Sequence, residues 1–85
     1  MSYTIELTVG VEEVLPPDFE HTVVCKSVYK DTETDTYFCE IKGIDDLEWQ
    51  VLKESDSFLL FNTEIRISSI KPSRSGKAAS VLITF

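Results

Sequence analysis

The sequence predicts a mainly β protein of the α+β class, built as a small antiparallel sheet or a partly closed barrel of about five to six strands with one short helix. Several segments alternate apolar and polar residues, and polar segments of loop length separate them. Only one segment carries the pattern that begins a helix. At 85 residues the chain leaves no room for a second core, so we expect a single domain over residues 1–85.

The first predicted strand covers residues 3–9. It alternates with period two, so that its apolar residues share one face and its polar residues share the other. Gly10 and the segment 12–18 follow it, and that segment includes Pro16 and Pro17. Proline has no amide proton to donate to a neighbouring strand, so we expect a loop here.

A β-hairpin is predicted from residues 21–29 and 37–42, both rich in β-branched and aromatic residues, with a polar loop between them. If Lys30 lies opposite Thr34, then Cys25 lies opposite Cys39. One face of the hairpin would then carry a set of core residues: Val23, Cys25, Tyr29, Tyr37, Cys39 and Ile41.

The short helix is predicted over residues 44–54. Asp45 can cap the first turn and Glu48 completes a capping box, while Ile44 can pack against Trp49. Leu47 and Val51, spaced i, i+4, would face the sheet, and Trp49 would be buried with them.

The last third of the chain predicts further strands at residues 58–61, 64–70 and 79–85. Asn62 and Thr63 fit a tight turn between the first two strands. The segment 71–77 contains Pro72 and Gly76 and fits a long hairpin loop before the last strand.

Three segments of the sequence match part of a motif that carries chemistry. The acids of residues 31–35 resemble the start of a calcium-binding EF-hand loop, but Thr36 and Lys42 replace the glycine and glutamate it needs. Ser75-Gly76-Lys77 lacks the rest of a phosphate-binding P-loop. His21, Cys25 and Cys39 offer three zinc ligands or a Cys–His nucleophile pair, without a Cys-x-x-Cys motif. We therefore expect no enzymatic activity, no metal and no cofactor.

The charge is distributed unevenly along the chain. Fourteen acidic residues oppose four lysines through Asp56, a balance of −10, whereas one acid opposes four cations beyond it, a balance of +3. An acidic protein is repelled by phosphate backbones, so direct nucleic-acid binding is not expected. No apolar run reaches the length of a membrane span and no signal peptide is recognisable. The expected location is the cytoplasm.

These observations favour a small acidic module that binds a protein stoichiometrically, as an inhibitor, immunity, anti-defence or adaptor protein does, including phage-encoded ones. The expected partner has a basic surface. The alternative is a structural subunit of a larger assembly, such as a virion component, joined through exposed strand edges. The sequence leaves the oligomeric state open. Candidate contact residues lie in three predicted surface segments: Asp31, Glu33 and Asp35; Asp45, Asp46 and Glu48; and Lys71, Arg74 and Lys77.

Overall fold

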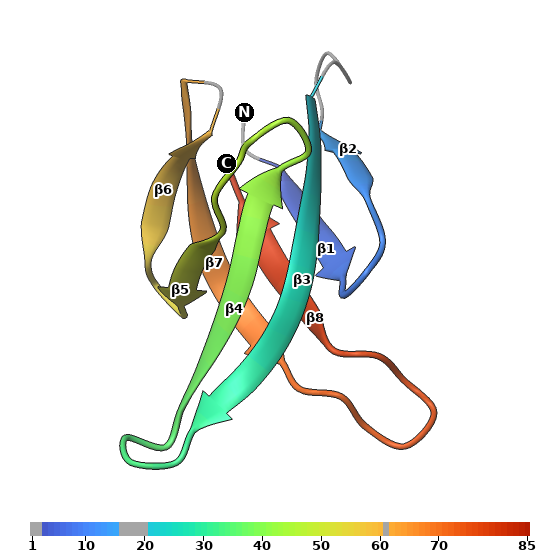
Figure 1. Ribbon diagram of the computed structural model, residues 1–85, viewed down its shortest axis with the longest axis vertical. Coiled ribbons are helices and arrows are strands. Elements are labelled where there is room, and N and C mark those ends of the chain that lie inside the picture. Colours follow the sequence, from blue (N-terminus) through green and yellow to red (C-terminus); the bar gives the residue numbers. More distant parts are fainter. Residues whose placement is uncertain (1–2, 16–20, 61) are drawn as a thin grey trace.

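A computed structural model describes residues 3–15, 21–60 and 62–85 as two four-stranded antiparallel sheets that pack face to face (Figure 1). The terminal sheet has the order β1 (Thr4–Thr8), β8 (Ser80–Thr84), β7 (Thr63–Lys71) and β6 (Ser57–Leu60). The central sheet has the order β2 (Glu13–Leu15), β3 (His21–Asp31), β4 (Thr36–Gly43) and β5 (Gln50–Lys53).

The mainly β class is confirmed, whereas the strand number and the helix are wrong. Eight strands and no helix occur in the described residues. One of the additional strands, β2, lies inside the predicted loop 12–18, where Leu15 pairs with His21. The predicted proline break at Pro16 and Pro17 lies outside the described residues. None of the described segments forms a helix that could cross a membrane.

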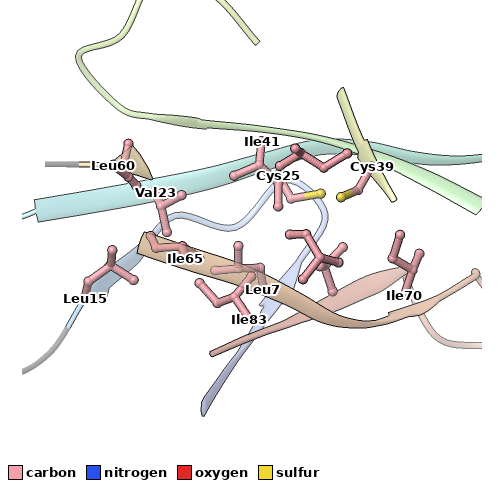
Figure 2. Close-up of a cluster of buried hydrophobic side chains, with 13 residues drawn as sticks. Leu7, Leu15, Val23, Cys25, Cys39, Ile41, Leu60, Ile65, Ile70 and Ile83 are labelled. Atoms are coloured by element: carbon pink, nitrogen blue, oxygen red, sulfur yellow. The ribbon is translucent and has the colours of Figure 1, made fainter. Parts of the chain in front are cut away.

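The core consists of the apolar side chains that the strands direct into the space between the sheets, mostly from alternate positions along each strand (Figure 2). Leu7, Val81 and Ile83 of the terminal sheet have no exposed surface, and neither do Val23 and Ile41 of the central sheet. The cluster has eight further members: Leu15, Cys25, Cys39, Leu52, Leu60, Ile65, Ile67 and Ile70. The outward positions of β1, Thr4 and Glu6, are exposed, as the alternation predicts.

Each of the two long strands contains a β-bulge. The register shifts between Cys25 and Ser27 in β3 and between Ile67 and Ser69 in β7. A bulge adds one residue to one strand, so side chains beyond it change face. This is why Ile70 is buried although it follows Ile67 by three residues.

The predicted hairpin of β3 and β4 is confirmed, but its register is wrong. Lys30 pairs with Tyr37, and Cys25 pairs with Ile41. The turn comprises residues 32–35, with Asp35 at a φ of 58°, and together with the bulge it shifts the pairing. Five of the six predicted face members are buried or pack against the core, but Tyr29 is exposed and stacks on Phe38 instead.

The segment predicted as a helix forms a loop, residues 44–49, followed by strand β5. The carboxylate of Asp46 accepts a hydrogen bond from the Gly43 amide at 3.1 Å, and the Asp46 amide donates to the Gly43 carbonyl at 3.0 Å. The Asp46 side chain, which would lie in the first turn of the predicted helix, thus bonds to the backbone of a turn instead. The backbone of β5 then pairs with β4.

The packing predicted for that helix is also absent. Leu47 is 96% exposed and Val51 is 53% exposed. Trp49 is partly buried, but its ring contacts cations: Lys42 Nζ lies 5.0 Å from the ring centroid and Lys26 Nζ lies 5.7 Å away. Trp49 therefore fastens the loop to the outside of the central sheet through cation–π contacts.

The core predicts a clear contrast between two aliphatic residues. Ile83→Ala removes a fully buried side chain from β8 and should lower the free energy of unfolding by about 2–5 kcal/mol. Leu59→Ala removes a side chain that is 75% exposed and should change it by no more than about 0.5 kcal/mol. Urea denaturation of both variants measures the difference, and equal losses would contradict the assigned core.

Candidate functional site

The first group of predicted contact residues lies in the turn between β3 and β4. The Asp31 carboxylate accepts hydrogen bonds from the Glu33 amide at 3.0 Å and the Thr34 hydroxyl at 3.1 Å. Asp35 forms an ion pair with Lys30, and the hydrogen bond between the two side chains raises the pKa of the lysine. Asp31 and Asp35 thus stabilise the turn itself.

The second group lies in the β4–β5 loop, where Asp45, Asp46 and Glu48 are exposed around Leu47. Asp46 holds the loop through the hydrogen bonds to Gly43 described above, and its carbonyl accepts a hydrogen bond from Lys42 Nζ at 2.8 Å. These hydrogen bonds connect the loop to the end of β4, and the loop exposes Leu47 among three carboxylates.

The two acidic groups do not form one surface. Strand β4 separates the two loops, which lie at opposite ends of the molecule (Figure 1). The sequence identified exposed acids in both places, but it could not show that a rigid strand holds them apart. One small contact surface cannot include both groups.

The third group lies in the β7–β8 hairpin. Lys71 ends β7, while Arg74 and Lys77 face each other across a tight turn. Their side chains line a pocket of about 470 Å³ together with Glu6, Thr8, Pro72, Ala78 and Ser80. Glu6, Thr8 and Ser80 were missed as site residues because nothing in the sequence shows that β1 pairs with β8.

The candidate nucleophiles Cys25 and Cys39 are free thiols buried in the core, with their sulfur atoms directed toward one another (Figure 2). Burial raises the pKa of Cys25 to about 11 and that of Cys39 to about 12. A thiol must ionise to attack an electrophile or bind a metal, and the raised pKa values keep the thiolate fraction of both cysteines small at neutral pH. In the described part of the chain, no three His, Cys, Asp or Glu side chains are grouped to hold a metal ion.

Comparison of the chain with models of protein families, with curated proteins and with solved structures gives no match.

The buried thiols lead to a prediction about labelling and pH. In the native protein both cysteines should react slowly with a thiol reagent, and unfolding should make both reactive. Because the folded pKa values exceed the ordinary value of 9.0, unfolded thiols ionise first. The free energy of unfolding should therefore be unaffected by the thiols below pH 9.0 and fall as pH rises from there toward about 11.

Urea denaturation at several pH values measures this fall, and the matched control is the Cys25→Ala, Cys39→Ala double variant. Its stability should decline less between the same pH values, since lysines and tyrosines titrate in both proteins. An identical decline in the two proteins would contradict the role of the thiols.

Proposed function

We propose that this chain is a stoichiometric protein-binding module that contacts a basic partner through its β4–β5 loop. The observation that carries the proposal is Leu47, which is 96% exposed at a loop bearing three carboxylates. An inhibitor, immunity, anti-defence or adaptor protein acts in this way, by occupying a surface of its partner without chemistry.

The internal contacts of the loop support this role. An exposed leucine on a mobile loop would lose conformational entropy on binding, which lowers affinity. Here the hydrogen bonds of Asp46 and the contacts of Trp49 with Lys26 and Lys42 fix the loop before it meets a partner. Leu47 can then enter an apolar recess with little further ordering.

The charge of the loop supports a basic partner. Asp45 and Glu48 flank Leu47, and the whole chain carries a net charge of −7. Complementary charge accelerates encounter and excludes partners of the wrong sign, while a few residues at the centre of an interface supply most of the affinity.

A structural subunit remains the second candidate, because three edge strands carry exposed apolar side chains. Val14 of β2 is 42% exposed, Val51 of β5 is 53% exposed and Leu59 of β6 is 75% exposed. Each strand has one neighbour in the described sheets, so its other edge is open to strand addition. Assembly of this kind would appear as concentration-dependent oligomers on a sizing column, whereas the first candidate stays monomeric.

The test compares Leu47→Ser with Leu59→Ser, a matched change at an exposed leucine outside the loop. Both variants should fold like the native chain. A partner isolated with the native chain should bind Leu59→Ser unchanged and Leu47→Ser roughly 30-fold more weakly, the loss typical of a central contact residue. Equal binding by the two variants would contradict the proposed loop.

A second test separates the two acidic groups. Asp45→Lys with Glu48→Lys should slow association with the partner, and the native association rate should fall as salt is added. Glu33→Lys with Asp35→Lys makes the same charge change at the opposite end and should have a smaller effect on the rate. Stopped-flow mixing or surface plasmon resonance measures both rates, and a larger effect of the second pair would move the contact to the β3–β4 turn.

A further inference from the structure

We propose that the pocket beside the β7–β8 hairpin binds a small phosphate monoester that carries a hydroxyl group near its phosphate. The inference is independent of the protein partner proposed above. The pocket encloses about 470 Å³, within the size range of small-molecule sites. Its lining includes three cations, one carboxylate and two hydroxyls: Lys71, Arg74, Lys77, Glu6, Thr8 and Ser80.

The floor of the pocket is a row of polar residues on the outer face of the terminal sheet. Thr8 pairs with Ser80, and Ser80 pairs with Lys71, so the three side chains share one face across β1, β8 and β7. The adjacent row, Leu7, Val81 and Ile70, faces the core. Ser80 is nevertheless only 7% exposed. The sheet therefore fixes the backbone positions from which two hydroxyl side chains and one lysine line the pocket.

The hairpin places two further cations against each other. The Arg74 amide donates to the Lys77 carbonyl at 3.0 Å and the Lys77 amide donates to the Arg74 carbonyl at 2.9 Å, with Gly76 at a φ of 79° in the turn. Like charges directly opposite one another in a hairpin are destabilising. In the described part of the chain neither cation forms an ion pair. A doubly charged anion between them would remove this repulsion.

Glu6 determines which anion fits. Its Oε2 accepts a hydrogen bond from the Ser80 hydroxyl at 3.1 Å and lies 3.9 Å from Lys71 Nζ. A carboxylate beside a phosphate site repels additional negative charge but can accept a hydrogen bond from a ligand hydroxyl. The pocket thus combines a phosphate-binding side, at Arg74 and Lys77, with a hydroxyl-binding side, at Glu6.

The surroundings disfavour a long polyanion. The pocket is a cationic region on a chain whose net charge is −7. The β3–β4 turn, which bears Asp31, Glu33 and Asp35, projects from the same end of the molecule (Figure 1). The two hairpins project to opposite sides of that end (Figure 1), so a nucleic acid long enough to span both would meet these acids, whereas a small phosphate monoester would not.

The test titrates the isotope-labelled protein with glycerol phosphate and follows its amide signals by NMR. The expected dissociation constant lies in the range of about 0.1–1 mM. Shifts should concentrate at residues 71–80 and at Glu6 and Thr8. Methyl phosphate, which has no hydroxyl, should bind several-fold more weakly, and glycerol should not bind.

Variants localise the binding. Arg74→Gln should weaken glycerol phosphate binding roughly tenfold, the loss expected for one charge-assisted hydrogen bond. Arg66→Gln is the matched control, since it removes the same charge from an exposed site on β7 outside the pocket and should bind normally. Equal affinity of these two variants would overturn the proposed site.

Three further outcomes would overturn the proposal. If no phosphate ester binds, the pocket is not an anion site. If methyl phosphate binds as tightly as glycerol phosphate, the role given to Glu6 is wrong. If a single-stranded oligonucleotide binds more tightly than glycerol phosphate, the hairpin belongs to a nucleic-acid surface instead.

Discussion

The whole structure depends on burying one face of each sheet against the other. Each fully buried aliphatic side chain contributes about 1.5–3 kcal/mol, and the core consists of such side chains from both sheets. In a regular strand every second side chain faces the core. In β3 and β7 this regular alternation would direct the apolar side chains near one end of the strand away from the core. The two bulges correct this, because each adds one residue where the apolar spacing changes from two to three.

The elements best predicted from the sequence are those whose alternation is unbroken. The first strand and its exposed positions Thr4 and Glu6 follow directly from period two. The bulge in β7 also leaves a trace, because Ile65, Ile67 and Ile70 are spaced by two and then by three. In β3 the change of spacing cannot be recognised in the sequence, because Val28 and Tyr29 are both apolar. Regular alternation from Cys25 therefore predicts the core face for Tyr29, which is exposed.

The predicted helix fails for a physical reason that local patterns do not contain. Asp45 and Glu48 satisfy the capping rule, yet two residues after Glu48 the chain reaches the open edge of β4, which pairs with Gln50–Lys53. Pairing satisfies the backbone amides of β5 and buries Leu52, at 7% exposure. Tertiary pairing thus outweighs a local preference that contributes about 1 kcal/mol.

The candidate sites show the same limit of sequence reasoning. Residue types on loops can be identified from the chain, but their neighbours come from strand pairing at long separation. Ser80 and Glu6 meet across 74 positions because the chain ends lie on neighbouring strands, where Tyr3 and Phe85 exchange backbone hydrogen bonds. The alternation of apolar and polar residues predicts which face of a sheet a residue occupies. It does not predict which strand lies beside that residue.

The electrostatic repulsion between the two cations of the β7–β8 hairpin lowers stability by an amount that the fold tolerates. Arg74 and Lys77 repel one another, but both are exposed, so solvent screens much of the repulsion and the two backbone hydrogen bonds of the turn hold the pair together. Neither side chain belongs to the core, so the pair can serve a ligand without weakening the packing between the sheets. An anion that binds only the folded hairpin must stabilise the whole protein by an amount that rises with the logarithm of its concentration once the site is mostly filled, because unfolding abolishes the arrangement of β1, β7 and β8 that forms the pocket.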